Sequence, residues 1–292
     1  MHKSTLIILC FIIALFLTQS CETFDPKEDI PAYIKIDTLM HPGLYPTGYS
    51  CAYVYVNYSL VGVFEVPRTI PVLVSDSAIV TIRPGINKNG ANYTRTYYEM
   101  AEPYQTKVFL EPTKTVTINP TTVNKAMIET PWFEDFETSA ISMQAKDSLS
   151  PQLQVVRQTR PGHTGYIGEI KISPSDTLTN KYEYEYYDSM LIYFQGVPSY
   201  LELSYKSTQP FEVRLNAYLI RNNQLHDKSV MHIFASPDQW KRIHIDFSSI
   251  VTDLGPGVFY KPYIRLYRND NTGEQDTIKV CLDDLRIVYE KR

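Results

Sequence analysis

Hydrophobic and polar residues alternate with a period of two along most of this chain. The segment AYIKID (32–37) places Ala32, Ile34 and Ile36 on one face. The same alternation runs through CAYVYV (51–56), EVRLNAYL (212–219) and WKRIHIDF (240–247). Because successive side chains of a strand point to opposite faces, this period predicts β-strands with one buried face. We find no convincing helical period over about ten residues, so the pattern predicts an all-β protein.

Turn signals separate the alternating segments at a spacing typical of antiparallel β-sandwiches. Pro84-Gly85, Asn89-Gly90 and Gly255-Pro256-Gly257 are such signals. Roughly 270 residues follow the apolar N-terminal segment. That length is large for a single core and predicts two domains. A polar stretch follows the segment TVTI (115–118). We therefore expect a small sandwich over residues 31–127 and a larger one over residues 128–292.

Both expected domains resemble known families. The segment from Ala52 to Ile86, which contains AYVYV and TIRPG, resembles the PEGA-type or immunoglobulin-like modules of bacterial envelope proteins. The second domain resembles the galactose-binding-like jelly rolls of carbohydrate-binding modules, through WFEDFE (132–137), GHTGYIGEIKI (162–172), WKRIHIDF and IKVCLDDLRIVY (278–289). The first resemblance implies a structural or adhesive module. The second implies a jelly roll, a fold that serves sugar binding, adhesion and scaffolding alike.

The N-terminus has the pattern of an export signal. Its apolar run from Leu6 to Leu17 is too short to span a bilayer of ~30 Å hydrocarbon thickness. The end of this run, LTQSC (17–21), resembles a bacterial lipobox, which implies that residues 1–20 are removed and Cys21 is lipidated. The acidic tether over residues 21–30 is similar to the export signals of surface lipoproteins of the Bacteroidota. These resemblances imply a lipid-anchored outer-membrane protein, with the cell surface favoured over the periplasmic face.

Composition narrows the class of partner. The chain is 43% hydrophobic with a net charge of -4, which argues against nucleic acid because phosphate recognition needs a concentrated basic face. Its 23 tyrosines suit an all-β binding protein, since tyrosine favours strands and offers rigid contact area. Cys51 and Cys281 lie far apart in the sequence, and we expect two buried free thiols rather than a disulfide.

The closing segment IKVCLDDLRIVY contains a break in its alternation at Asp283-Asp284. The apolar residues before this pair have even numbers and those after it have odd numbers: Ile278, Val280 and Leu282, then Leu285, Ile287 and Tyr289. A strand keeps one buried face through such a break only by inserting an extra residue. The break therefore predicts a β-bulge at the acid pair.

This bulge suggests a metal site. In galactose-binding-like jelly rolls the first and last strands together hold a structural calcium ion, and the resemblance implies a site built from Asp135, Glu137, Asp283 and Asp284. The alternative is that these acids are solvated strand ends that discourage pairing between sheet edges. No other cofactor is expected.

The sequence contains no catalytic motif that we can identify. Glycosidases need two carboxylates ~5 to 10 Å apart across a cleft, whereas Glu134 and Asp135 lie on opposite faces of any strand. There is no G-x-S-x-G elbow, no H-E-x-x-H and no glycine-rich phosphate loop. We expect a protein that is not an enzyme.

Two tyrosine-rich segments are candidate binding surfaces. In KYEYEYYD (181–188) the tyrosines alternate with glutamates, so they either stack a ligand or form the core face. In NYTRTYYEMAEPY (92–104) they follow the Asn89-Gly90 turn, where an interface is the functional interpretation. The candidate residues are Tyr93, Tyr97, Tyr98, Tyr104, Tyr182, Tyr184 and Tyr186.

Two functions follow as hypotheses. The first is an accessory or scaffold subunit of a cell-envelope protein assembly, which docks through its sandwich surfaces. The second is a surface lipoprotein that captures polysaccharide with the jelly roll. A glycan site should show solvent-facing aromatic side chains beside polar groups in a groove, whereas docking predicts a broad apolar patch.

Overall fold

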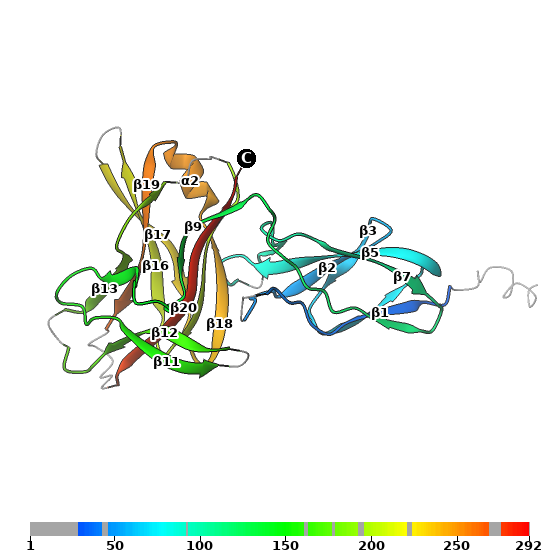
Figure 1. The fold of residues 1–292 in the computed structure, drawn as a ribbon, viewed down its shortest axis with the longest axis horizontal. Helices are drawn as coiled ribbons and strands as arrows, with labels where there is room; N and C mark the ends of the chain where they lie inside the picture. Colours follow the sequence, from blue (N-terminus) through cyan, green and yellow to red (C-terminus); the bar gives the residue numbers. More distant parts are fainter. Residues whose placement is uncertain are drawn as a thin grey trace, which may run out of the picture.

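The protein consists of two β-sandwiches that lie end to end along its long axis (Figure 1). The computed structural model describes residues 29–42, 46–91, 93–160, 163–176, 179–191, 196–220, 224–268 and 276–291. The predicted all-β fold class is confirmed. The signal segment and Cys21 lie outside the described residues. Within them, no helix is both long enough and apolar enough to span a membrane.

The N-terminal sandwich packs a three-stranded sheet on a five-stranded one. The small sheet has the order β4 (Arg68–Val72), β1 (Ala32–Ile36), β8 (Thr115–Thr117). The larger sheet contains β3 (Ser59–Phe64), β2 (Cys51–Val56), β5 (Asp76–Asn87), β6 (Arg95–Tyr97) and β7 (Tyr104–Leu110), with β6 and β7 both pairing with β5.

The small sheet departs from the predicted antiparallel arrangement because β1 and β8 run parallel. Alternation shows which face of a strand is buried but not which strand it pairs with or in which direction. A parallel pair needs a long connection between its strands, and here almost the whole sandwich separates β1 from β8 in the chain.

The C-terminal sandwich is a jelly roll of two sheets in which all pairings are antiparallel. The first lies on the side away from the N-terminal sandwich (Figure 1), and we call it the distal sheet. Its strand order is β10 (Met143–Ala145), β13 (Lys181–Tyr186), β19 (Val258–Tyr267), β16 (Phe211–Leu219), β17 (Gln224–Ile233), with β14 (Met190–Leu191) beside β19. The second, the proximal sheet, has the order β11 (Gln154–Arg160), β12 (His163–Ile172), β20 (Ile278–Glu290), β15 (Ser199–Ser207), β18 (Ser236–Asp246), with β9 (Ile128–Glu134) beside β20. A short helix, α2 (Ser248–Leu254), follows β18.

Each sandwich has its own apolar core, built from the alternating positions that the sequence indicated. Ile34, Val54 and Ile82 are fully buried in the first, and Leu215 and Ile245 belong to the second. Cys51 and Cys281 are free and buried, which confirms that prediction.

The predicted bulge is present in β20. The register between β15 and β20 shifts between Glu202 and Ser204, which pair with Arg286 and Asp283. Asp284 has a φ of 48°, the left-handed conformation common at bulges. The shift keeps Leu282 and Leu285 both in the core, as the change of parity required. The strand β9 ends with the first three residues of WFEDFE, and it pairs with the C-terminal part of β20.

Candidate functional site

The outer face of the distal sheet combines aromatic and charged side chains. The inner positions of its strands are core residues such as Tyr184, Leu215 and Ile264, so the alternate positions point outward. The register aligns outward residues in rows across β13, β19 and β16: Glu183, Arg265 and Glu212 form one row, and Glu185, Tyr263 and Arg214 form the next.

One half of this face is organised around Glu183. Its carboxylate accepts a hydrogen bond of 2.6 Å from Arg265 Nε and lies 3.0 Å from Lys146 Nζ. Burial alone would raise the pKa of Glu183, but the hydrogen bonds from Lys146 and Arg265 hold it below its ordinary value. The neighbouring Glu185 is paired with Lys261 Nζ at 2.8 Å. The Glu183 carboxylate is therefore ionised, and the cations beside Glu183 and Glu185 fix both side chains in position.

The other half is organised around Tyr263. Its hydroxyl donates to Asp227 Oδ1 at 2.7 Å and accepts from Arg214 Nε at 2.8 Å. Arg214 also grips Asp227 with two nitrogen atoms, each 3.1 Å from a carboxylate oxygen. The Tyr263 ring lies under Lys146, whose Nζ is 4.5 Å from the ring centroid. Burial opposes ionisation of Asp227, but Arg214 and Tyr263 bind its carboxylate and lower its pKa.

The pairing of Glu183 and Asp227 with cations argues against acid catalysis by these two residues. The general acid of a glycosidase needs a raised pKa, whereas the pKa values of Glu183 and Asp227 are lowered by their cationic and hydroxyl partners. Glu183 and Tyr263 are themselves buried under their partners, so these contacts hold the outer face rigid. Glu183 and Asp227 are unsuited to donating a proton to a leaving group.

A cleft of about 320 Å³ opens at one end of the outer face, and we call it the aromatic cleft. Tyr187 and Tyr218 are 57% and 39% exposed there, and Tyr218 pairs with Phe259 across β16 and β19. The cleft is lined by Tyr187, Asp188, Ser189, Tyr218, Phe259 and Lys261. Three aromatic rings beside a carboxylate, a hydroxyl and an amine give both stacking surfaces and hydrogen-bonding groups.

The acids of WFEDFE shape a turn. Glu134 is buried at the end of β9 and accepts hydrogen bonds from the Phe136 amide at 2.8 Å and from the Ser142 hydroxyl at 2.6 Å. Phe136 has a φ of 58° and its ring covers Gly168, where a side chain would collide with it. Glu134 thus satisfies backbone donors that the turn leaves free.

The four acids expected to bind calcium are placed in two groups. Asp135 accepts from the Glu137 amide at 3.1 Å, and Glu137 accepts from the Tyr166 amide at 2.8 Å. Asp283 and Asp284 are buried at the bulge, where Asp283 accepts from the Asp284 amide at 2.8 Å. Among the described residues, no three His, Cys, Asp or Glu side chains gather in a way that could hold a metal ion. Calcium binding stays a prediction that this arrangement does not favour.

The tyrosines of KYEYEYYD face the core, contrary to the binding-surface interpretation. Tyr182 and Tyr184 are fully buried, and Tyr186 is half-buried, with its ring centroid 5.0 Å from that of Trp132. The tyrosines pack in the apolar core, and the glutamates occupy the outward face, where cations pair with them. The next residue, Tyr187, is the exposed one.

The second tyrosine-rich segment does not form one surface. Tyr93 is 91% exposed and Tyr97 is 39% exposed, while Tyr104 packs half-buried against the N-terminal core. Tyr98 is buried between the two sandwiches, so it is not part of an open binding surface. A contact between domains leaves no periodic signal in the sequence.

Apart from Tyr98, the junction between the sandwiches depends on residues that the sequence did not single out. The Tyr98 hydroxyl donates to the fully buried Glu202, which is also bound by Arg242 Nη2 at 2.9 Å and Arg286 Nε at 2.8 Å. Burial would raise the pKa of Glu202, but Arg286, His244 and Arg242 hold it well below its ordinary value. The only sequence signal was a charged residue within an apolar strand.

Further contacts join the two sandwiches at β18. Lys88 pairs with Asp246 at 2.7 Å, the Asn89 amide donates to the His244 carbonyl at 3.0 Å, and the Asp246 amide donates to Asn89 Oδ1 at 2.9 Å. A buried cluster that includes Ile86, Tyr98, Tyr200 and Val288 crosses the same junction. The two sandwiches are therefore held in one arrangement.

Comparisons with known proteins return structural matches only. No family model matches the chain, and no curated protein matches it. A structure of a carbohydrate-binding module of the β-sandwich superfamily aligns with a TM-score of 0.41 and 11% identity over 90% of this chain and 99% of that one. The tandem CBM22 domain of a Paenibacillus barcinonensis protein gives 0.40 and 14% over 88% of this chain and 77% of that one.

A third match is to the CBM22-1–GH10 modules of a Clostridium thermocellum xylanase. Its TM-score is 0.39 and its identity 10%, over 56% of this chain, and this chain spans 29% of that one. At these scores and identities the matches do not establish a relationship, and we base the function on the geometry of the site.

Proposed function

We propose that this protein is a non-catalytic carbohydrate-binding protein that captures a polysaccharide on the outer face of the distal sheet. The aromatic cleft is the observation that carries this proposal. Tyr187, Tyr218 and Phe259 supply ring faces beside Lys261 and Asp188, and sugars present apolar faces and hydroxyl groups that need this combination. It is also the combination that we expected to separate a glycan site from a protein-docking patch.

The length of the face fits a chain of sugars better than a single one. Outward positions of β19 continue from Phe259 at the cleft to Tyr267, which is 45% exposed. At ~3.3 Å per residue these positions span about 26 Å. Between the two aromatic ends lie ionised side chains already held by their partners, so binding would cost little side-chain ordering.

The proposal includes a lipid anchor at Cys21 and a place on the outer membrane, with the cell surface favoured. Support comes from the lipobox-like sequence and from the direction of the chain. The strand β1 begins at the end of the N-terminal sandwich that is far from the jelly roll (Figure 1). In this arrangement the N-terminal sandwich acts as a spacer that holds the distal sheet away from the membrane.

A retention assay tests the proposal. In affinity electrophoresis, the whole chain should be slowed by at least one neutral polysaccharide in a panel of xylan, mixed-linked β-glucan, galactomannan and starch. The variant Tyr187→Ala should lose most of that retardation, because it removes one exposed ring of the cleft. The control Tyr93→Ala removes a ring that is 91% exposed on the other sandwich and should migrate as the parent does. A panel without any retardation would refute the proposal.

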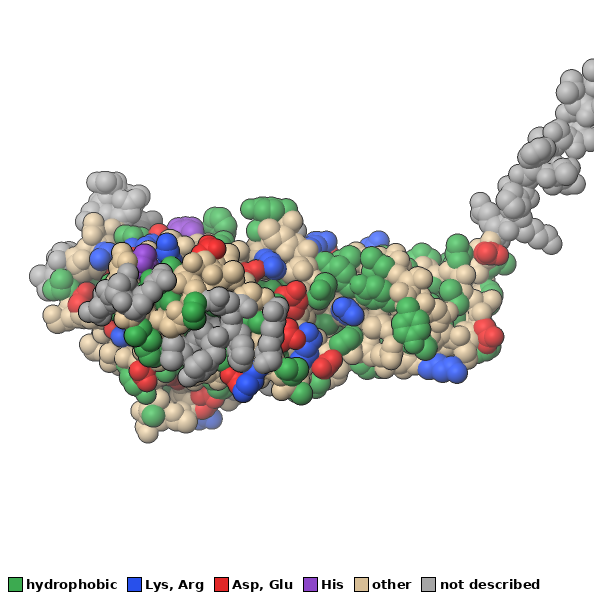
Figure 2. Space-filling view, turned by 90° about the horizontal axis from the view of Figure 1, so that it is seen from above, with side chains coloured by type: hydrophobic (Ala, Val, Ile, Leu, Met, Phe, Trp, Pro, Cys, Tyr) green, Lys and Arg blue, Asp and Glu red, His purple; other side chains and the backbone are tan. Residues whose placement is uncertain are grey.

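Docking to an envelope protein remains a second hypothesis, supported by one observation. Figure 2 shows hydrophobic side chains gathered on the N-terminal sandwich. On the edge strand β3, Leu60, Val61 and Val63 are exposed, an arrangement that soluble proteins usually protect. Co-purification from native membranes, with Val63→Asp as the disrupting variant, would show whether a stoichiometric partner binds there.

A further inference from the structure

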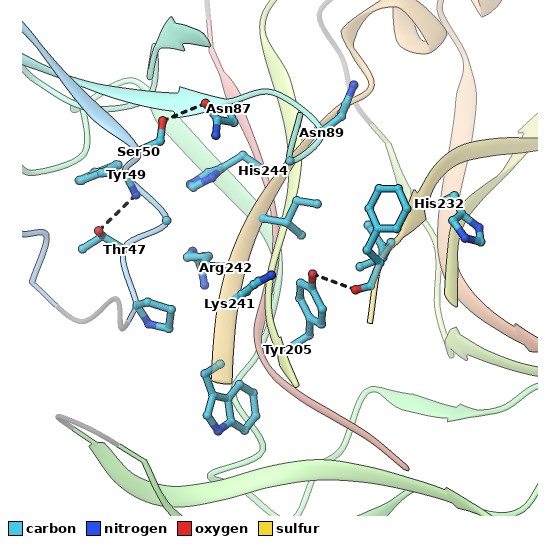
Figure 3. A pocket seen from close by; sticks show the side chains of 17 residues that line it. Thr47, Tyr49, Ser50, Asn87, Asn89, Tyr205, His232, Lys241, Arg242 and His244 are labelled. Atoms are coloured by element: carbon cyan, nitrogen blue, oxygen red, sulfur yellow. Dashed lines mark hydrogen bonds between the residues drawn. The ribbon is translucent and has the colours of Figure 1, made fainter. Parts of the chain in front are cut away.

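A second pocket, of about 460 Å³, lies where the two sandwiches meet (Figure 3). One wall comes from N-terminal residues, including Thr47, Ser50 and Asn87. The other comes from the jelly roll, including Phe234, Trp240 and Lys241. We call it the junction pocket. It is separate from the aromatic cleft, with which it shares no lining residue.

Both walls of the junction pocket are held in place before any ligand arrives. The Asn89 contacts and the Lys88–Asp246 ion pair fix the N-terminal wall to β18. Within that wall, the Ser50 hydroxyl donates to Asn87 Oδ1 at 3.1 Å (Figure 3). A pocket that is already ordered binds its ligand without paying for loop closure.

The pocket offers aromatic surface to a ligand. Phe234 is 74% exposed, and the edge-on ring of His232 lies 6.0 Å away, centroid to centroid. The Tyr205 hydroxyl donates to the Phe234 carbonyl at 3.2 Å, which ties this residue to the sheet (Figure 3). Trp240 is half-buried at the same wall. Such rings suit the apolar face of a sugar.

The charge of the pocket distinguishes it from the aromatic cleft. Its lining includes Lys241 and Arg242 and no carboxylate, whereas the cleft includes Asp188. The charge of Arg242 is balanced by Glu202, so Lys241, which is exposed and makes no ion pair within the described residues, is the cation that faces a ligand. The lining therefore favours an anion among sugars.

We propose that the junction pocket is a second carbohydrate site that takes an acidic saccharide, with a uronic-acid carboxylate at Lys241 and the sugar ring against Phe234 and Trp240. The junction site would extend the proposed glycan-binding function to a second class of ligand. It rests on that proposed function only for the assumption that the protein binds polysaccharides. The neutral chain on the distal sheet and the acidic unit at the junction would be bound independently, on opposite sides of the jelly roll.

Calorimetric titration of the whole chain with tetragalacturonate and tetramannuronate tests the proposal, with cellotetraose as the neutral probe. At least one uronic-acid probe should bind. The variant Lys241→Glu should weaken that binding more than tenfold, and Phe234→Ala about fivefold, because both change exposed side chains and leave the core intact. Lys228→Glu makes the same charge change on an exposed residue outside the pocket and should bind as the parent does.

The outcomes separate this site from the aromatic cleft. If the uronic-acid probes do not bind, or bind Lys241→Glu and Phe234→Ala as tightly as the parent, the junction pocket is not an acidic-sugar site. If Lys228→Glu weakens binding as much as Lys241→Glu does, the attraction is a general surface effect and the proposal fails. If uronic-acid binding depends on Lys241 while no neutral polysaccharide is retained, the proposal for the cleft fails and this one stands.

Discussion

Glu202 carries a buried negative charge between Arg242 and Arg286, at the point where Tyr98 reaches across from the other sandwich. Taking one partner out of such a group leaves the other charges buried and uncompensated. A single carboxylate therefore affects both the jelly roll and the way the N-terminal sandwich is seated on it.

We expect Glu202→Gln to lower the free energy of unfolding by about 3–5 kcal/mol, measured by urea denaturation. The matched change Glu65→Gln removes the partner of Arg95 in an exposed ion pair and should cost less than about 1 kcal/mol. Equal effects of the two substitutions would show that the buried group does not stabilise the junction.

His244 should make the stability of the protein fall as the pH is lowered. Burial lowers its pKa to about 4, from an ordinary 6.5, although Glu202 opposes the shift and Arg242 and Arg286 add to it. Between these two values the unfolded chain takes up a proton that the folded protein does not. The contribution is complete above pH 6.5 and is lost as the pH falls towards 4.

From this shift we expect a loss of about 2 kcal/mol between pH 7 and pH 5. Glu202 does not affect this measurement. Its pKa is lowered by folding, so the stability that it contributes is lost mainly below pH 4.5, its ordinary pKa. The variant His244→Gln should show a flatter pH profile of the melting temperature over this window. An unchanged slope in the variant would assign the effect to other groups.

The strands show which structural features alternation can predict. In β16 and β18 the apolar positions form the core as expected, and the change of parity in β20 located a bulge that leaves Asp284 with a positive φ. In β13 alternation separated the tyrosines from the glutamates, and Tyr184 is the inner residue, but the pattern did not show that Glu183 on the outer face is also buried. Nor could it show the parallel pairing of β1 with β8, which depends on contacts between residues distant in the sequence.

The turn between β2 and β3 provides a prediction about one hairpin. Asn57 and Tyr58 have φ values of 48° and 68°, the conformation of a type I′ turn, for which Asn-Gly is preferred. Tyr58→Gly should therefore raise stability by about 0.5–1 kcal/mol, measured by thermal melting. Leu60→Gly, at an exposed position of β3, should instead lower it, since glycine weakens a strand. A loss of stability in Tyr58→Gly would mean that contacts of the exposed Tyr58 ring stabilise the protein by more than its positive φ destabilises it.

The two sandwiches together make an elongated molecule with distinct ends (Figures 1 and 2). The sequence predicted both sandwiches, but the junction pocket and the buried charges beside it arise only when the two pack together. The aromatic cleft was not predicted either, because Tyr218 and Phe259, which line it, look like ordinary strand residues in the sequence. Its exposed aromatic cleft is the feature on which the proposed function depends.

The most direct measurement compares how tightly two variants, Tyr218→Ala and Tyr166→Ala, bind an oligosaccharide of the neutral polysaccharide that retards the parent protein in electrophoresis. The two tyrosines are 39% and 44% exposed, the first on the distal sheet and the second on the proximal one. Loss of one stacking ring should weaken binding about tenfold, or ~1.4 kcal/mol. We predict this loss for Tyr218→Ala and none for Tyr166→Ala in calorimetric titrations. Unchanged affinity in Tyr218→Ala, or an equal loss in both, would contradict a glycan site on the outer face of the distal sheet.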